Sequence, residues 1–206
     1  MAPLDPYIEP GTSTLKNLLG LRNLRELAAA EADLVNARTV QLGDLEFETF
    51  IPNSRDEREL RAIHHHLFQD IYPFAGEIRT IDMRRGEGEL FAPCAGISQN
   101  LFSLAEQLND KNLLRNLGRN EFLKELVYFY SMLNWIHPFR EGNGRTQRLF
   151  WSRVALDAGW LLDWRQFGTD LNEASRISRE QNDDSLLFEG FESMLFRAAD
   201  CELDGR

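Results

Sequence analysis

Residues 137–148 read His-Pro-Phe-Arg-Glu-Gly-Asn-Gly-Arg-Thr-Gln-Arg, and the rest of the chain is interpreted outward from this segment. Gly142 and Gly144 bracket Asn143 and free the backbone for a turn that can point successive N–H groups at one anion. A helical pattern follows over residues 145–156. A Gly-x-Gly turn that opens a helix places unpaired N–H groups and the positive end of the helix dipole where a phosphate would bind.

The charged side chains of this motif segment, residues 137–148, suit a nucleotide. Arg145 and Arg148 are three residues apart, so they share one helix face, and the planar guanidinium fork matches phosphate oxygens. Glu141 is a lone carboxylate beside them, which suits Mg²⁺ because that ion takes few protein ligands together with phosphate oxygens. His137 is of the residue type whose unperturbed pKa lies nearest neutrality, so it can take a proton from a hydroxyl. These parts predict transfer of a phosphate-containing group to a hydroxyl.

The motif segment resembles the signature of the Fic family, His-x-Phe-x-(Asp/Glu)-Gly-Asn-Gly-Arg-x-x-Arg, at every specified position. The resemblance implies an all-α Fic-fold helical bundle with one β-hairpin flap over the active site. It also implies transfer of AMP from ATP to a hydroxyl side chain of a target protein, with release of pyrophosphate. The implied roles are general base for His137, Mg²⁺ ligand for Glu141, anion hole for Gly142, Asn143 and Gly144, β- and γ-phosphate contacts for Arg145 and Arg148, and inward anchor for Phe139.

The second glycine of the motif separates two activities within the family. Members that phosphorylate their targets depart from Gly-Asn-Gly, and this chain keeps it at residues 142–144. Three alternatives stay open at this point: transfer of another phosphate-containing group, a non-catalytic module that senses nucleotide, and a module that sequesters a partner. The intact His137 argues against the non-catalytic module, since a site without chemistry has no need of a base.

Composition sets the broad class. The chain has 206 residues and a net charge of −10 with a pI near 4.9. An acidic surface argues against direct nucleic-acid binding, which relies on basic groups. No apolar run approaches the ~20 residues of a membrane span, and the first residues lack a signal-peptide pattern. Cys94 and Cys201 have no metal-ligand spacing, which favours a reducing, cytoplasmic setting.

Apolar periodicity predicts a single helical domain over residues 1–206, with its core between residues 5 and 199. Residues 121–135 are apolar nearly all round in their second half, which is typical of a central buried helix, and Asn120 is its expected N-cap. The consecutive histidines 64–66 point in different directions around their helix, so a metal site there is disfavoured. The segments expected to be helical are 15–19, 22–36, 55–71, 97–108, 121–135, 145–156, 169–182 and 184–199.

One stretch breaks the helical pattern. Residues 77–93 alternate, turn at a Gly-containing segment and alternate again, which predicts a β-hairpin. A surface ornament is one reading of an isolated hairpin. The resemblance implies instead the Fic flap, which registers the target chain by strand addition. Arg85 and Gly86 fall where the family often has Lys-Gly near the nucleotide.

The N-terminal arm, residues 1–21, is similar to that of the class I Fic toxins, which a separate small antitoxin holds inactive. This resemblance implies a bacterial toxin–antitoxin pair, and targets such as DNA gyrase or topoisomerase IV subunits. Ser185, Glu189 and Gly190 also match the short Fic inhibitory motif, whose glutamate pairs with the second motif arginine, here Arg148. A chance match is the preferred interpretation, because this stretch also resembles the last packing helix of the Fic core.

Overall fold

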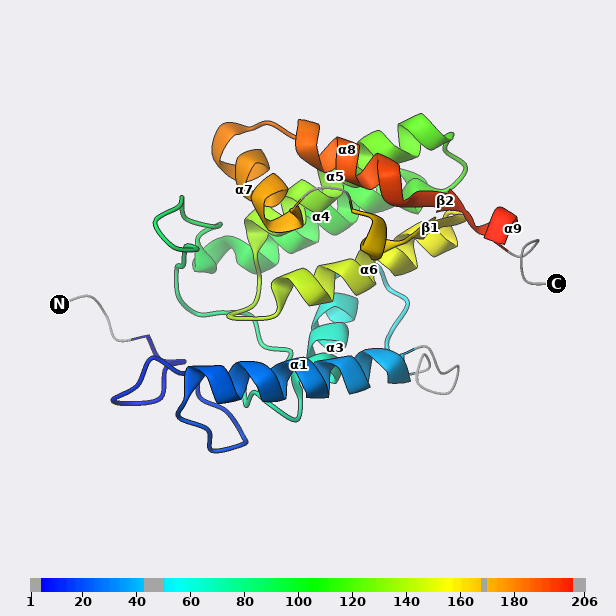
Figure 1. Cartoon of the computed structure of the whole chain (residues 1–206). Coiled ribbons are helices and arrows are strands. Elements are labelled where there is room, and N and C mark those ends of the chain that lie inside the picture. Colours follow the sequence, from blue (N-terminus) through cyan, green and yellow to red (C-terminus); the bar gives the residue numbers. More distant parts are fainter. Residues whose placement is uncertain (1–4, 43–49, 168–169, 202–206) are drawn as a thin grey trace.

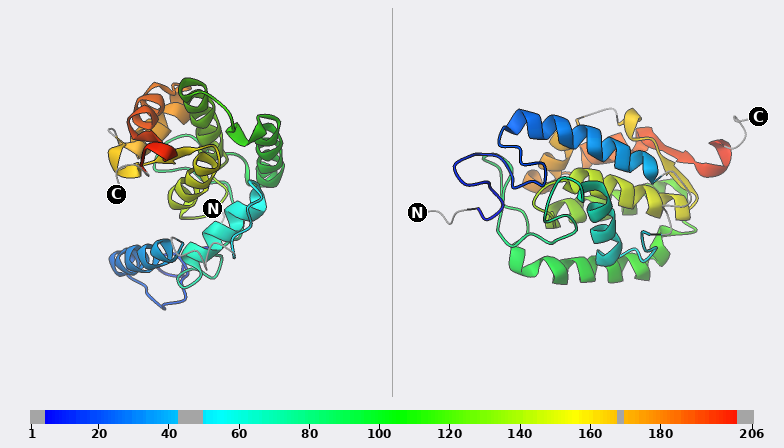
Figure 2. Two further views of the ribbon diagram at one scale, coloured as in Figure 1. Left: turned by 90° about the vertical axis from the view of Figure 1, so that its right-hand side faces the viewer. Right: turned by 90° about the horizontal axis from the view of Figure 1, so that it is seen from below.

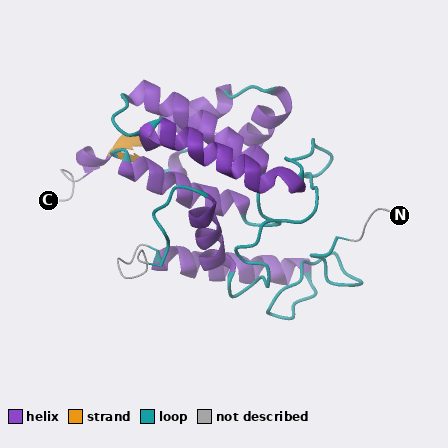
Figure 3. Ribbon diagram, turned by 180° about the vertical axis from the view of Figure 1, so that it is seen from behind, coloured by secondary structure: helices purple, strands orange, loops and turns teal. Residues whose placement is uncertain are grey.

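The computed structural model describes residues 5–42, 50–167 and 170–201. The fold is almost entirely helical, and its strands are confined to a short pair near the C-terminal end (Figures 1 and 3). The helices, in chain order, are α1 (Leu24–Gln41), α3 (Glu57–Phe68), α4 (Ile97–Asp110), α5 (Arg119–Ile136), α6 (Asn143–Asp157), α7 (Leu171–Gln181), α8 (Ser185–Met194) and α9 (Ala198–Cys201). Short 3₁₀ turns lie at Cys94–Gly96, Asn112–Leu114 and Trp164–Gln166.

Helix α5 is the centre of the packing. It contacts α4, α6, α7 and α8, and its buried side chains include Phe122, Phe129 and Tyr130. Helix α6 lies beside it and buries Trp151 completely. The prediction of a central buried helix over residues 121–135 is therefore confirmed, and the site at its end is held by the most heavily packed part of the chain.

Helix α1 forms a separate layer. It lies across α3, which joins it to the rest of the helices through α6 and α4 (Figures 1 and 2). Asn23 caps α1 and Asp56 caps α3, each by accepting N–H bonds from the first turn. Only Leu27 and Val35 of α1 are buried, so this helix makes a thin contact with the core.

Two expectations about helix starts are wrong. Residues 15–19 are not helical, because Leu15 pairs with Ile8 in an antiparallel bridge and the Lys16 N–H donates to the carbonyl of Tyr7. The N-cap of α5 is Gly118 rather than Asn120, since the helix already begins at Arg119.

The last predicted helix also ends early. Helix α8 stops at Met194, and the next residues form β2 (Leu195–Arg197), which pairs antiparallel with β1 (Trp160–Leu162). In the register of this pair Leu161 faces Phe196 across the ladder. Gly159, which follows α6 with a φ of 84°, turns the chain into β1 in the left-handed conformation common just after a helix end.

The flap, residues 77–93, is a narrow turn rather than a two-stranded hairpin. Its only strand-like pairing is a single antiparallel bridge between Arg84 and Leu90, in the described part of the chain. In the register of this bridge the next hydrogen-bonded pair would be Ile81 and Pro93, and Pro93 has no N–H to donate. The carbonyls of Ile81 and Ala92 accept hydrogen bonds from the Arg79 side chain instead. The expected β-hairpin is therefore corrected to a loop closed at its base by an arginine.

Candidate active site

The junction of α5 and α6 places the motif segment. His137 is the C-cap of α5 and adopts the left-handed conformation with a φ of 48°, while its N–H still donates to the carbonyl of Leu133. Pro138 cannot continue the helix. The chain then turns, and Gly142, with a φ of 78°, opens α6. His137 and the first residues of α6 therefore line the same pocket.

The His137 imidazole is held in one tautomer. Its Nδ1 lies 3.2 Å from the carbonyl oxygen of Asn134, which can only accept, so Nδ1 donates and Nε2 keeps its lone pair. The Phe91 ring of the flap stacks on it with ring centroids 3.7 Å apart. Burial, outweighing the Asn134 carbonyl, lowers the pKa of His137 to about 3. The imidazole is therefore neutral at physiological pH, the form a proton acceptor needs.

The Gly-Asn-Gly turn, residues 142–144, opens α6 where an anion nest was predicted. The first bond of α6 runs from the Thr146 N–H to the Gly142 carbonyl, so the N–H groups of residues 143–145 precede the helical ladder. The Asn143 side chain does not point at a ligand: its Oδ1 accepts from the Phe139 N–H and its Nδ2 donates to the Phe139 carbonyl. Asn143 therefore locks the turn with its side chain and offers only its backbone to an anion.

Gly142 has no room for a side chain. A Cβ at this position would overlap the Phe68 ring, in addition to the strain of a positive φ. Phe139 is buried as expected, 1% exposed, and stacks on the imidazole of His64. Phe68 and His64 of α3 therefore pack against the turn and limit its shape.

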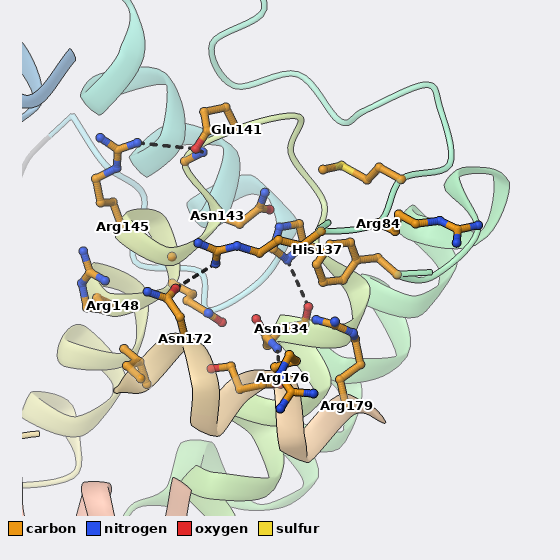
Figure 4. A pocket seen from close by; sticks show the side chains of 18 of the residues that line it. Arg84, Asn134, His137, Glu141, Asn143, Arg145, Arg148, Asn172, Arg176 and Arg179 are labelled. Atoms are coloured by element: carbon orange, nitrogen blue, oxygen red, sulfur yellow. Dashed lines mark hydrogen bonds and ion pairs between the residues drawn. The ribbon is translucent and has the colours of Figure 1, made fainter. Parts of the chain in front are cut away.

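The two motif arginines have different surroundings. Arg145 forms ion pairs with Glu31 of α1 and, at 3.6 Å, with Glu141. Arg148 forms no ion pair within the described ranges, and burial lowers its pKa. Figure 4 shows Arg145 and Glu141 together on one side of the pocket, with Arg148 further along the same helix. Among the described residues, Arg148 is thus a motif cation that no carboxylate neutralises.

A pocket of about 730 Å³ joins these groups. It is large enough for a nucleotide, since ligand pockets span about 300–1,000 Å³. All predicted site residues line it: His137, Glu141, Gly142, Asn143, Gly144, Arg145, Arg148, Arg85 and Gly86. Its wall is strongly cationic despite the net charge of −10 of the chain. Among the described residues the lining arginines are Arg84, Arg85, Arg140, Arg145, Arg148, Arg176 and Arg179.

Helix α7 supplies a wall that was not predicted from the sequence. Arg176 and Arg179 face the motif segment across the pocket (Figure 4). They share the three-residue spacing of Arg145 and Arg148, and that spacing was the available signal. Arg179 stacks on the Phe91 ring of the flap at 4.5 Å. The chain therefore places cations on both sides of the space above His137.

Two further buried residues support the site. The Nδ1 of His64 accepts the Gly76 N–H at 2.7 Å, so its Nε2 carries the proton and donates to the Glu141 carbonyl at 3.0 Å. Arg79, which is 1% exposed, donates to the carbonyl of His137 at 2.8 Å. His64 lies on the apolar stripe of α3, which was its available signal. Arg79 has no such local signal.

A magnesium ion fits the acidic group of the pocket. No cluster of three or more His, Cys, Asp or Glu side chains capable of holding a metal occurs in the described part of the chain. Glu141 lines the pocket with a side chain that is 43% exposed, and one of its oxygens accepts the Gly142 N–H at 2.9 Å. Asp170 and Glu173 also line the pocket, but Asp170 caps α7 and Glu173 pairs with Arg176. Glu141 is the lining carboxylate beside the Gly-Asn-Gly turn, and it suits an ion that takes most of its ligands from phosphates and water.

Glu189 lies outside this pocket. It is exposed on α8, and it is absent from the residues that line the cavity.

Across residues 5–42, 50–167 and 170–201, none of the helices combines the length and apolar composition that crossing a bilayer requires. Cys94 is a free thiol.

Fold and site together define a Fic-fold helical domain with a cationic pocket of nucleotide size. The sequence model of the Fic/DOC family matches residues 54–155. A probable protein adenylyltransferase Fic from Salmonella typhimurium is 32% identical over 200 residues, which cover 96% of each chain. Its Escherichia coli counterpart is 34% identical over 163 residues, 78% of this chain and 77% of that one. The chain belongs to the Fic/DOC family.

Two solved structures share the whole fold. The N-terminal Fic domain of a putative cell filamentation protein from Bartonella quintana, with bound ADP, superposes with a TM-score of 0.87 at 28% identity. The match covers 96% of this chain and 97% of that one. BepC from Bartonella tribocorum, with bound AMPPNP, gives a TM-score of 0.85 at 27% identity over 93% and 96% of the two chains.

Proposed function

We propose that this chain, a protein adenylyltransferase of the Fic/DOC family, transfers AMP from ATP to a hydroxyl side chain of a target protein. The observation that supports this most directly is a neutral His137 beside a Gly-Asn-Gly helix start, inside a pocket with arginines on two walls. Relatives solved with ADP and AMPPNP support ATP as the substrate.

In the proposed reaction the target hydroxyl oxygen attacks the α-phosphorus, and its proton passes to Nε2 of His137. The bond from the α-phosphorus to the bridging oxygen breaks, and pyrophosphate leaves. The resemblance assigns the anion hole to residues 142–144. Because the Gly142 N–H donates to the Glu141 carboxylate, the N–H groups of residues 143–145 and the dipole of α6 are proposed to stabilise charge on the α-phosphate. Arg145 and Arg148 hold the β- and γ-phosphates. These roles follow the family signature and stay predictions for this chain.

Glu141 would hold the magnesium ion that accompanies the nucleotide. When bound, such an ion neutralises charge on the phosphate oxygens. The Arg145 guanidinium, which lies 3.6 Å from the Glu141 carboxylate, orients that carboxylate.

The proposed partners follow from the same site. The flap lies beside the pocket and has a single antiparallel bridge, Arg84–Leu90, so strand addition of a target chain to it is a proposal based on resemblance. The toxin role, the separate antitoxin carrying an inhibitory glutamate, and gyrase or topoisomerase IV subunits as targets remain proposals based on resemblance. Arg148 supports the antitoxin, since a carboxylate from another chain would find this arginine without an ion pair among the described residues. A cytoplasmic setting is part of the proposal because ATP is available there.

The test is incubation of the purified chain with Mg²⁺ and α-labelled ATP in a bacterial lysate, beside a His137→Ala variant and a γ-labelled reaction. The proposal expects α-label on a discrete protein band, lost in the variant, and no γ-label. Purified gyrase and topoisomerase IV subunits then test the expected targets.

Transfer of γ-label instead would mean phosphorylation and would contradict the inference drawn from Gly-Asn-Gly. Equal labelling by wild type and His137→Ala would remove the general base. No label from either nucleotide, with ATP binding intact, would favour a nucleotide-sensing module.

A further inference from the structure

One buried arginine ties together three parts of the chain around the site. The side chain of Arg79 is 1% exposed, and its guanidinium donates to backbone carbonyls. Nε reaches the carbonyl of His137 at 2.8 Å, and Nη1 reaches that of Ile81 at 2.6 Å. Nη2 donates to Ala92 and, at 3.3 Å, to Ile136. These contacts are all to backbone carbonyls, so they hold the backbone in place and do not pair the guanidinium with a carboxylate.

The four carbonyls belong to functionally distinct segments. Those of Ile136 and His137 are at the C-terminal end of α5, where carbonyls lack helical partners and the dipole is negative. The carbonyls of Ile81 and Ala92 lie on the two sides of the base of the flap. The Arg79 N–H also donates to the Pro138 carbonyl at 2.9 Å. Arg79 therefore joins the end of α5 to both ends of the flap.

This arrangement is costly and specific to arginine. Arg79 forms no ion pair within the described ranges, although Asp82 attracts it electrostatically from further away. Burying a charge without a directly paired counter-charge carries a large desolvation cost. Burial lowers its pKa accordingly. Hydrogen bonds from a charged donor are stronger than neutral ones, so the four carbonyls together can offset this cost. Lysine has three donors at one point and cannot span four carbonyls in a plane.

The consequence lies at His137. Its left-handed backbone, with a φ of 48°, is unfavourable for a residue with a side chain. Arg79 binds the carbonyls on either side of this conformation. By holding Ala92, Arg79 also fixes the neighbouring Phe91, whose ring stacks on the imidazole. The arginine thus orients the imidazole both through its own backbone and through the ring that covers it.

We propose that Arg79 is a positioning residue for AMP transfer, which sets the orientation of His137 and docks the flap on it without touching the nucleotide. This inference rests on the proposed function. It is specific because the phosphate-binding groups, residues 143–145 and Arg148, lie on α6, which Arg79 does not contact through any of its hydrogen bonds among the described residues.

The experiment compares Arg79→Lys and Arg79→Met with the wild type. AMP transfer to the labelled target is measured at saturating ATP, and ATP affinity is measured by calorimetry. The transfer rate is expected to fall about 10²-fold, the scale of a 1 Å misplacement of a catalytic group. ATP affinity should change less than about threefold, or about 0.7 kcal/mol. Arg79→Lys keeps a cation and a similar volume, in case Arg79→Met does not fold.

Arg55→Lys is the matched control. Arg55 is also buried, 4% exposed, but pairs with Glu59 and Asp157 outside the pocket. Its substitution should lower the melting temperature and leave the transfer rate of the folded protein unchanged. Equal rates for wild type and Arg79→Lys would overturn the inference, as would a parallel loss of ATP affinity and rate.

Hydrogen exchange separates this inference from the proposed function. Arg79→Lys should speed exchange of the Phe91, Ala92 and His137 amides by about tenfold or more, since the bonds around them loosen. Arg55→Lys should not. If the wild type transfers no AMP, the proposed function fails, while the exchange result still decides whether Arg79 holds the flap on His137. Unchanged exchange in Arg79→Lys contradicts the inference.

Discussion

Two buried histidines make the stability of this protein depend on pH. Burial lowers the pKa of His64 to about 4 and that of His137 to about 3, against 6.5 for an ordinary histidine. Between these values the unfolded chain binds more protons than the folded one, so stability is complete above pH 6.5 and is lost as the pH falls toward 4. Protonation of His64 would also remove the lone pair of Nδ1 that accepts the Gly76 N–H.

His64→Gln tests this linkage. The free energy of unfolding in urea should fall more steeply for the wild type than for the variant as the pH is lowered from about 6.5 to about 4.5. The difference in slope should approach one proton, about 1.4 kcal/mol per pH unit. His65→Gln is the control, because His65 is exposed on the same helix. Identical slopes for wild type and His64→Gln would show that His64 does not titrate in this way.

Gly142→Ala tests the shape of the anion nest. The new Cβ would overlap the Phe68 ring and sit at a φ of 78°. Backbone strain costs about 1–2 kcal/mol and overpacking about 1–3 kcal/mol more. Urea unfolding should report the sum, and calorimetry should report at least about tenfold weaker ATP binding, since the N–H groups of the nest shift.

Gly159→Ala is the matched control for that substitution. Gly159 has a φ of 84°, but a Cβ added there would have no atom within 4 Å, so only the strain applies. Its stability loss should be the smaller of the two, and ATP binding should not change. Equal losses in the two variants would mean that Phe68 moves aside and does not shape the nest.

Among the secondary-structure elements, α7 acts as the support of the flap. The Glu180 carboxylate accepts the Glu89 N–H at 3.3 Å, Arg85 donates to Asn172 at 2.9 Å, and Arg179 covers Phe91. These contacts hold a loop that has one strand-like bridge of its own among the described residues. The flap therefore depends on a helix that is distant in the sequence, since Glu89 and Glu180 are 91 residues apart.

Glu180→Ala should loosen the flap without unfolding α7. Amide exchange over residues 85–91 is expected to rise by about tenfold, corresponding to about 1.4 kcal/mol of local stability. Glu173→Ala serves as the comparison, since Glu173 also pairs with Arg176 but forms no hydrogen bond to the flap in the described residues. A similar rise in both variants would point to a general effect on α7.

For the molecule as a whole, the position of α8 bears on regulation. Glu189 is exposed, and the pocket with Arg148 is lined by α5, α6, α7 and the flap. Glu189→Ala should therefore leave AMP transfer within about twofold of wild type, a change below about 0.5 kcal/mol. The Arg148→Ala variant should lose AMP transfer, because it removes the guanidinium proposed to contact a phosphate of ATP. A large gain of activity in Glu189→Ala would revive self-inhibition through residues 185–190.

The N-terminal arm also belongs to the assembled molecule. Asp5 pairs with Arg140 of the motif segment at 2.8 Å, and the Tyr7 hydroxyl accepts the Thr80 N–H at 3.0 Å beside the flap. Glu31 of α1 pairs with Arg145. Residues 5–42 thus contact several parts of the site.

Short spacings in the sequence were enough to predict the local geometry of the motif segment. The Gly-Asn-Gly turn, the helix that it opens, the shared face of Arg145 and Arg148 and the histidine at the end of a buried helix all follow from neighbouring residues. Such spacings are governed by the helical repeat and by the conformational freedom of glycine, which do not depend on the rest of the chain.

What surrounds that chemistry depends on how the helices pack, and it could not be predicted. Arg79 reaches His137 across 58 residues, and Arg145 reaches Glu31 across 114. The expected hairpin has one strand-like bridge among the described residues, and its base is bound instead by the Arg79 side chain and, through the Ala92 N–H, by the carbonyl of Trp135. A hydrogen-bond donor gives no local signal of which distant carbonyl it will meet. The reactive groups are therefore encoded in residues 137–148, while the orientation of His137 is set by tertiary contacts.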